Sequence, residues 1–261
     1  MIALRYEGEG KGATAVLTLQ RPERGNALDA PLVEALIGAV ESCVADAALH
    51  TLVIEGEGAD FCTGFDLGLL DAGNDVEAAA IDAALLTRFV RVEHLLSMLW
   101  HAPFRTVAVA HGRAFGAGAD LFAACDLRLA TASAQWRFPG AAFGIVLGTR
   151  RLGEQVGVAR ALDWVGTGRV LDTQVAQQHG LVTSLVDRET WREQLPALAV
   201  GRDTYAALRA AARVDKRDDD MAALVRSAMT PGLARRITDY RKGLMRQRAR
   251  PQSGVGNEPN D

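Results

Sequence analysis

The chain has 261 residues, of which 49% are hydrophobic and 23% are charged, and it carries a formal net charge of −3. This composition is that of an ordinary globular protein, and the length suffices for one large domain or a domain with an appendage. The slightly acidic balance argues against nucleic acid as a partner, and no segment approaches the roughly 18 apolar residues of a membrane span. The N-terminus lacks the pattern of a targeting leader, and the three cysteines form no CxxC pair. We therefore expect a cytoplasmic protein with reduced thiols, no bound metal and no membrane contact.

The first part of the chain is predicted to alternate strands and helices. Expected here are a hairpin that pairs the first residues with a strand over 13–19, a helix over 29–46, a strand over 51–55 and a long helix over 77–100. Asp29 is a favourable N-cap, and Pro31 suits the first helical turn. Residues 69–76 read as a loop between the second strand and the long helix.

The pattern changes along the second part of the chain. Expected here are strands over 106–110, 127–130 and 181–186, a short helix over 120–125, and helices over 159–165, 173–179, 191–198, 205–211, 221–229 and 233–248. Strands alternate with helices as far as about residue 187, which predicts an α/β fold, and only helices follow. The predicted organisation is a core over 1–187, a helical C-terminal region over 188–250 and a disordered tail over 251–261.

The most informative stretch is TVAVAHGRAFGAGADLFAACDLRLA, residues 106–130. Gly116, Ala117 and Gly118 leave almost no side-chain volume, so a ligand can approach the backbone closely. An anionic group at this turn would meet free N–H donors at the start of a helix, with the Asp120 carboxylate beside it. A dinucleotide-binding motif is disfavoured because its third glycine is missing. Tight packing of a helix against small residues is the structural alternative.

A second loop of small residues strengthens the case for an anion site. In Phe61 to Leu67, Gly64 follows a buried strand and Asp66 opens the next turn. Two such loops can supply two backbone donors, and two donors aimed at one oxygen stabilise an enolate or a tetrahedral oxyanion. We therefore expect the two loops to meet at one oxyanion site.

Four segments together resemble the enoyl-CoA hydratase/isomerase (crotonase) superfamily over about residues 17–187. LQRPERGNALDAPLVEAL resembles the opening of the family, TLVIEGEGADFCTGFDLGLL its first oxyanion loop, AVAHGRAFGAGADLFAACDLRLA its second, and GLVTSLV the end of its core. The resemblance implies an α/β fold built as a spiral of ββα units, with a helical C-terminal trimerisation region. It further implies a homotrimer or a dimer of trimers, an acyl-CoA substrate, no cofactor apart from the CoA of the substrate, and a place in fatty acid metabolism.

The resemblance also implies roles for individual residues. The backbone N–H groups of Phe65 and Ala117 would hold the thioester carbonyl oxygen, and Asp120 would be the acid/base. The residues expected to bind the substrate are Glu23, Arg24, Ala27, Thr63, Gly64, Phe65, Asp66, Leu67, Gly116, Ala117, Pro139 and Gly140.

The chain departs from the hydratase pattern at its acids. Hydratases of this family use two glutamates; the first position here is Asp120, and the second, after Pro139, is Gly140. Hydration needs a base for water and an acid for the α-carbon, whereas isomerisation needs one group that removes a proton and returns it elsewhere. Asp120, next to an apolar pocket, should have a raised pKa, which suits a proton carrier. The sequence leaves open a hydratase, an isomerase, an acyl-CoA-binding homologue without catalysis, and Asp120 as a simple helix cap.

Several other side chains have two interpretations. Arg88 and Arg91 are candidates to bind a carboxylated acyl group, with a solvated helix face as the alternative. Arg137 and its aromatic neighbours either narrow the pocket or belong to the core. The basic last helix, including Arg241, either faces solvent or contacts CoA phosphates.

Overall fold

The computed structural model describes residues 1–8, 13–68 and 75–249. Within these ranges the main sheet contains β1 (Ile2–Glu7), β2 (Ala13–Leu19), β3 (Leu49–Gly56), β4 (Arg105–Ala110), β6 (Leu127–Ala130) and β9 (Ser184–Leu185), in the order β1-β2-β3-β4-β6-β9. β1 and β2 form an antiparallel hairpin, and the pairs that follow are parallel. A smaller sheet joins β5 (Arg113–Phe115), β7 (Gln135–Arg137) and β8 (Leu171–Asp172).

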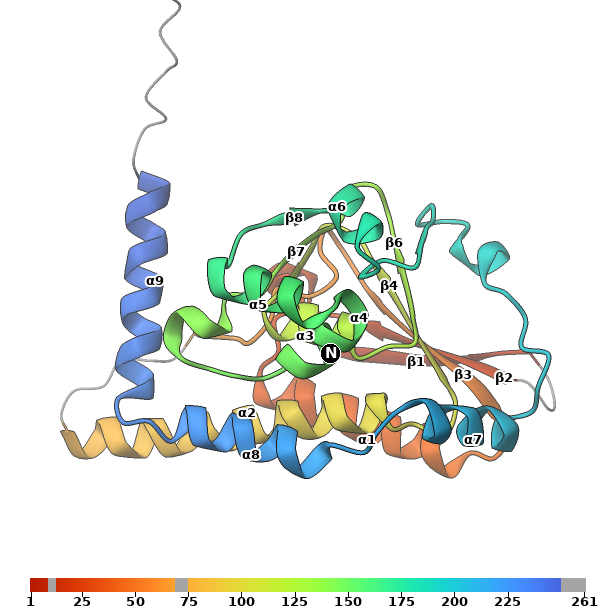
Figure 1. The fold of residues 1–261 in the computed structure, drawn as a ribbon, viewed down its shortest axis with the longest axis horizontal. Helices are drawn as coiled ribbons and strands as arrows, with labels where there is room; N and C mark the ends of the chain where they lie inside the picture. The colour runs from red at the N-terminus through yellow and green to blue at the C-terminus, as the bar shows by residue number, and fades with distance from the viewer. Residues whose placement is uncertain (9–12, 69–74, 250–261) are drawn as a thin grey trace, which may run out of the picture.

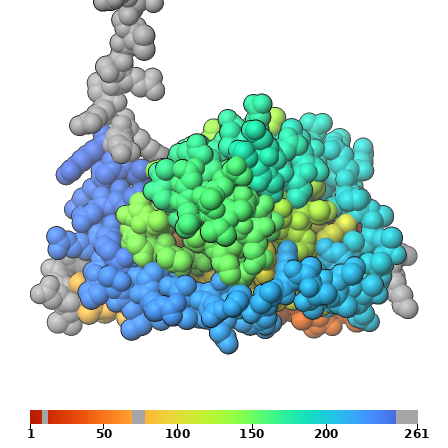
Figure 2. Space-filling view, viewed as in Figure 1, coloured from red at the N-terminus to blue at the C-terminus, as the bar shows by residue number. Residues whose placement is uncertain are grey.

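Helices surround these sheets. They are α1 (Ala30–Ala45), α2 (Asp75–Trp100), α3 (Ala117–Ala123), α4 (Thr149–Val156), α5 (Val158–Thr167), α6 (Thr173–Gln178), α7 (Arg202–Ala212), α8 (Arg217–Ala228) and α9 (Leu233–Ala249), with 3₁₀ turns at Pro22–Arg24, Gly140–Phe143 and Trp191–Gln194. α2 packs against α1, α8 and α9, and Figure 1 shows α9 standing upright at one end of the molecule. In Figure 2 the C-terminal helices, in blue, form a band along the lower edge and one flank of the visible face.

The parallel strands are apolar because both faces of the main sheet are covered. β4 is buried along its whole length. Its Val107 and Val109 join one hydrophobic cluster, while Ala108 and Ala110 join the large core on the opposite face. The two-residue period of a strand sends alternate side chains to these two cores.

Helix α9 is fixed to the rest of the molecule at its first turn. The Asp82 carboxylate of α2 accepts hydrogen bonds from the backbone N–H groups of Gly232, Leu233 and Ala234 at 3.0, 3.1 and 2.7 Å. These N–H groups have no acceptor within their own helix, and the carboxylate also complements the helix dipole. Leu233 and Ile237 are then buried against α2 in a second hydrophobic cluster. This anchor directs the following turns of α9 toward the cavity described below.

Most of the predicted elements are confirmed. The hairpin, the strands β3, β4 and β6, and the helices α1, α2, α5 and α6 lie where the sequence patterns place them. Asp29 caps α1, since its Oδ1 accepts from the N–H of Leu32 at 2.9 Å. The predicted helix over 191–198 is wrong, because Trp191–Gln194 forms only a 3₁₀ turn.

Two features of the middle of the chain were not predicted, namely the small sheet and α4. The division near residue 187 stays a prediction, and the predicted tail over 251–261 lies outside the described residues. None of the helices in the described ranges is both long and apolar enough to span a membrane.

Candidate active site

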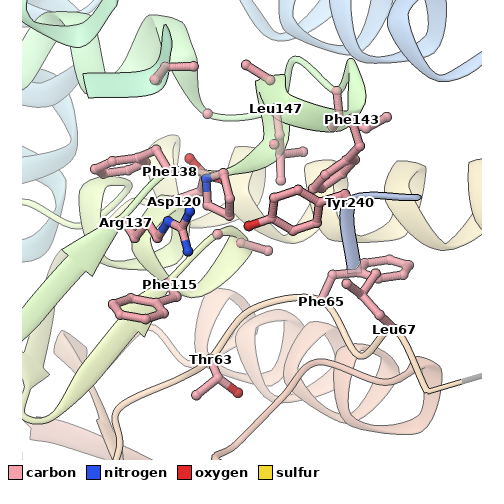
Figure 3. Close-up of a pocket in the computed structure, with 18 of the residues that line it drawn as sticks. Thr63, Phe65, Leu67, Phe115, Asp120, Arg137, Phe138, Phe143, Leu147 and Tyr240 are labelled. Carbon is pink, nitrogen blue, oxygen red and sulfur yellow. The ribbon is translucent and has the colours of Figure 1, made fainter. Parts of the chain in front are cut away.

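A cavity of about 260 Å³ lies where the two small-residue loops, the 3₁₀ turn at Gly140–Phe143 and the helices α2 and α9 come together. Thr63, Phe65 and Leu67 line it from the first loop, and Gly116, Ala117 and Asp120 line it from the second. The other lining residues are Phe89, Arg113, Phe115, Arg137, Phe138, Pro139, Gly140, Ala141, Phe143, Ile145, Leu147, Gly148, Thr149, Val165, Tyr240 and Leu244. Figure 3 shows that the aromatic side chains among them surround the space.

The two loops are in direct contact at Gly64. Its φ is 91°, and a Cβ at this position would lie 2.4 Å from the carbonyl oxygen of Phe115 and 3.2 Å from the backbone nitrogen of Ala117. Any other residue would therefore be strained and would push the loops apart. The N–H of Leu28 donates to the Gly64 carbonyl at 2.7 Å, which fixes the first loop in place.

Two backbone N–H groups belong to residues that line the cavity from these loops, Phe65 and Ala117. Ala117 is the first residue of α3, so its N–H has no acceptor within the helix. The N–H of Phe65 lies next to Gly64, at the contact between the loops. Neither N–H group has an acceptor among the described residues, although their neighbours Gly116 and Asp66 do. The two groups are thus available to an oxygen atom in the cavity.

Asp120 lies in the first turn of α3, beside these donors. The N-cap of α3 is Gly116, so the alternative that Asp120 merely caps its helix is wrong. Protein surrounds the Asp120 side chain, which keeps some surface toward the cavity. Burial raises the pKa of Asp120 to about 7, a rise that Glu93 increases and Arg151 opposes. The group can therefore both accept and donate a proton near neutral pH.

A buried network of charges lies behind Asp120. The Arg151 guanidinium of α4 pairs with Glu93 of α2, through Nη1 at 3.0 Å from Oε2, and with Asp220 of α8 at 3.1 Å. Arg150 makes a two-pronged contact with the same Asp220 at 2.7 and 2.6 Å. Burial raises the pKa of Glu93 despite its bond to Arg151. This network was not predicted from the sequence. Glu93 lies four residues after Phe89 on the apolar face of α2, a position that indicates a buried carboxylate.

Eight of the predicted substrate-binding or catalytic residues line the cavity: Thr63, Phe65, Leu67, Gly116, Ala117, Asp120, Pro139 and Gly140. Gly64 lies directly behind them. Glu23, Arg24, Ala27 and Asp66 do not line it. Asp66 instead forms ion pairs with Arg21 at 2.8 Å and with Arg24 at 3.5 Å, next to the first loop. A role of these four residues toward the CoA part of a substrate stays a prediction.

The two arginines proposed for a carboxylated acyl group are engaged elsewhere. Arg88 lies over the ring of Phe65, 4.2 Å from its centroid, and donates to the carbonyl of Asp66 at 2.8 Å. Arg91 forms an exposed ion pair with Glu34. Neither lines the cavity, whereas Arg137 does.

Helix α9 supplies residues that line the cavity and that were not predicted from the sequence to belong to the site. Tyr240 and Leu244 reach the cavity from its apolar stripe. Arg241 on the same helix donates to the carbonyl of Leu67 at 2.8 Å, so α9 also holds the end of the first loop. In the ranges that the structure describes, no cluster of three or more His, Cys, Asp or Glu side chains is placed to hold a metal ion.

Sheet, helices and cavity define an α/β protein of the crotonase fold. The family model for enoyl-CoA hydratase/isomerase matches residues 9–242. A probable enoyl-CoA hydratase of Bacillus subtilis is 33% identical over 174 residues, which are 65% of this chain and 64% of that relative. Another, of Rhodobacter capsulatus, is 30% identical over 250 residues, 92% of this chain and 93% of the relative.

Solved structures agree with this assignment. A structure from Bordetella parapertussis, assigned to the enoyl-CoA hydratases/isomerases, superposes with a TM-score of 0.82 at 39% identity over 96% of this chain and 100% of that one. A structure from Thermobifida fusca is assigned as an enoyl-CoA hydratase in complex with acetoacetyl-CoA. It superposes with a TM-score of 0.67 at 29% identity, over 89% of this chain and 95% of that one. The chain belongs to the enoyl-CoA hydratase/isomerase family, and it is an enzyme of that family.

Proposed function

We propose that the protein moves a proton on the enolate of an enoyl-CoA thioester and that Asp120 is its single acid/base. The observation that carries this proposal is one carboxylate with a pKa of about 7 beside two unpaired N–H groups at a largely apolar cavity. The structure from Thermobifida fusca, which holds acetoacetyl-CoA, supports an acyl-CoA ligand. The reaction would need no cofactor beyond the CoA of the substrate.

The chemistry follows from where charge develops. The N–H groups of Phe65 and Ala117 donate to the thioester oxygen, which becomes negative as a proton leaves the α-carbon. In an apolar cavity such fixed donors stabilise the enolate more than water would. Ionised Asp120 takes the α-proton of a 3-enoyl thioester, the double bond shifts through a dienolate, and the same proton returns to the γ-carbon. The product is the 2-enoyl isomer, and the enzyme is regenerated.

Isomerisation is favoured over hydration because of Gly140. Asp120 is the only carboxylate among the described residues that line the cavity. For hydration it would have to take a proton from water as the oxygen bonds to the β-carbon, and then give that proton to the α-carbon. The sequence leaves open whether another acid enters from residues 69–76, and residues 69–74 of that segment lie outside the described residues.

The test compares two substrates and two variants. The wild-type protein should convert 3-enoyl-CoA to 2-enoyl-CoA and hydrate crotonyl-CoA more slowly. Asp120→Ala and the isosteric Asp120→Asn should both abolish turnover, while the affinity for the thioester changes little. Turnover that persists in Asp120→Asn contradicts the assignment. If the wild type binds enoyl-, dienoyl- and dicarboxyl-CoA thioesters but turns over none, the protein is an acyl-CoA-binding homologue instead.

We also propose a homotrimer as the assembled form, or a dimer of such trimers. Val158 and Leu162 lie one turn apart on α5, and their side chains are exposed at 69% and 59%. Apolar side chains this exposed on one helix face suit contact with further copies of the chain. Light scattering on the purified protein would give the mass of a trimer or hexamer, and Leu162→Glu should reduce it.

A further inference from the structure

We propose that Arg137 and Tyr240 form a subsite that binds a second, ionised carboxylate at the far end of the acyl group. The preferred substrates would then be thioesters of short dicarboxylic acids. This inference rests on the proposed function in one respect, because it places the thioester carbonyl at Phe65 and Ala117.

Arg137 is fixed at the edge of the second loop. On β7 it lies opposite Phe115 of β5, and its carbonyl accepts from the N–H of Gly116 at 2.8 Å. Its Nε donates to the carbonyl of Gly168 at 2.6 Å, which fixes the guanidinium and leaves its two terminal amino groups. The side chain lines the cavity and has no carboxylate partner among the residues that the structure describes. A guanidinium in this setting has donors left for an anion.

The other guanidinium of the cavity wall is already satisfied. Arg113 contacts both carboxylate oxygens of Asp60, at 2.8 and 2.6 Å. A ligand carboxylate would therefore compete with Asp60 at Arg113 but with no protein carboxylate at Arg137.

Tyr240 supplies a neutral donor on the same side. Figure 3 shows its hydroxyl pointing into the cavity toward the Arg137 guanidinium. Burial raises the pKa of Tyr240, although the nearby positive charge of Arg137 works in the opposite direction, so the phenol is protonated at neutral pH. Its ring packs on Phe143 at 5.3 Å between centroids, and the Asp82 anchor fixes the start of its helix. No hydrogen bond to a described residue contributes to the pKa shift of the Tyr240 hydroxyl.

The position of Arg137 limits the length of the acyl group. Arg137 pairs with Phe115 on the neighbouring strand, and neighbouring strands lie about 4.8 Å apart. Phe115 in turn comes two residues before the Ala117 donor. A thioester bound at Ala117 thus places the end of a short acyl chain, not a long one, near the guanidinium. Apolar walls at Phe138, Phe143 and Leu147 would shield the resulting ion pair from water.

The experiment uses acyl chains that lack a double bond, so that binding is separated from turnover. Succinyl-CoA and butyryl-CoA differ only in a carboxylate that replaces a methyl group. Calorimetry on the full-length wild type should show that succinyl-CoA binds on the order of 10- to 100-fold more tightly, the range of a charge-assisted hydrogen-bonded contact. Arg137→Gln should remove this preference, Arg137→Lys should keep part of it, and Tyr240→Phe should reduce it several-fold. Arg91→Gln, which removes an equal charge from an exposed ion pair, should leave it unchanged.

Two results would overturn the subsite. One is a wild type that does not distinguish the two thioesters. The other is an Arg137→Gln variant that weakens both equally, which would place Arg137 on the CoA part. Turnover is measured separately, as isomerisation of 4-carboxybut-3-enoyl-CoA and of pent-3-enoyl-CoA. If the wild type prefers succinyl-CoA but isomerises neither substrate, the subsite stands and the isomerase proposal is wrong. If it isomerises the substrates but shows no preference for succinyl-CoA, the isomerase proposal stands and the subsite is wrong.

Discussion

The backbone of Gly148 lies directly against the carboxylate of Asp120. A Cβ on Gly148 would come 2.2 Å from Oδ1 and 2.6 Å from Cγ of Asp120, closer than atoms can approach. Gly148 is also the N-cap of α4, the helix that carries Arg151 into the buried network. The glycine is required by this contact and not by its backbone angle, because its φ is −93°. The contact holds the Asp120 carboxylate in place from one side.

We predict that Gly148→Ala displaces Asp120 or shifts the start of α4. A misplacement of about 1 Å costs on the order of 100-fold in rate, so kcat/KM should fall by about that factor. Gly153→Ala on the same helix is the matched control, because its Cβ would meet nothing closer than 3.8 Å. That control should keep full activity and gain up to about 1 kcal/mol in stability from helix propensity. Steady-state kinetics and thermal unfolding of both variants test this, and an unimpaired Gly148→Ala enzyme would contradict it.

The ionised Asp120 carboxylate should lower the free energy of unfolding at neutral pH. Burial raises its pKa from 3.8 to about 7, so the folded protein binds this proton more tightly than the unfolded chain does. The stability that comes from the protonated form is complete below pH 3.8 and is lost as the pH rises through about 7. At 1.36 kcal/mol for each pKa unit, the loss is at most roughly 4 kcal/mol.

Asp120→Asn should therefore unfold at a higher temperature than the wild type at pH 8, although it is inactive. The difference should shrink steadily as the pH is lowered and approach zero near pH 4. Thermal unfolding of the two proteins across this range measures it. Equal stability at pH 8 would mean that Asp120 is ionised in the folded protein without strain.

The sequence was sufficient for features that depend on local patterns. β4 and α1 could be predicted because continuous apolar residues and an N-cap such as Asp29 are local signals. β7 and β8 could not, since strands of three and two residues carry no periodicity. Asp120 and its loop were predicted from the small residues Gly116, Ala117 and Gly118 before a helix and from the family resemblance, and the structure places them at the cavity.

The missing part of the site depends on contacts between distant segments. Arg151 lies in the polar helix TRRLGEQV, where charges usually face solvent, yet its side chain is only 1% exposed. Its partner Glu93 comes from a helix 58 residues earlier. Tyr240 reaches the cavity because Asp82 holds α9 from 152 residues away. No local sequence pattern predicts contacts between residues so far apart in the chain.

The buried network should set the pH at which the enzyme works. The negative charge of Glu93 raises the pKa of Asp120, and the positive charge of Arg151 lowers it. Glu93→Gln should therefore move the acidic limb of the kcat/KM profile to lower pH, and Arg151→Gln should move it to higher pH. Both variants break a buried ion pair and should lose about 3–5 kcal/mol of stability, so the profiles are recorded below their unfolding temperatures. Shifts in the same direction would show that the network acts only through structure.

Gly140 offers a way to add the second acid. It lines the cavity, and a Cβ there would lie 3.2 Å from the carbonyl oxygen of Ile145, a tight contact that a displacement of a few tenths of an ångström relieves. Gly140→Glu would then bring a second carboxylate to the cavity that Asp120 lines.

Two carboxylates that share an apolar space raise the pKa of one of them, which provides an acid beside a base. We expect hydration of crotonyl-CoA to rise about 100-fold, the lower end of the range for general acid–base catalysis, while isomerisation stays level or falls. Gly140→Gln adds the same volume without the acid and should leave hydration at the wild-type rate. An equal gain in Gly140→Gln would assign the effect to cavity shape, and no gain in Gly140→Glu would show that one carboxylate at Asp120 already suffices.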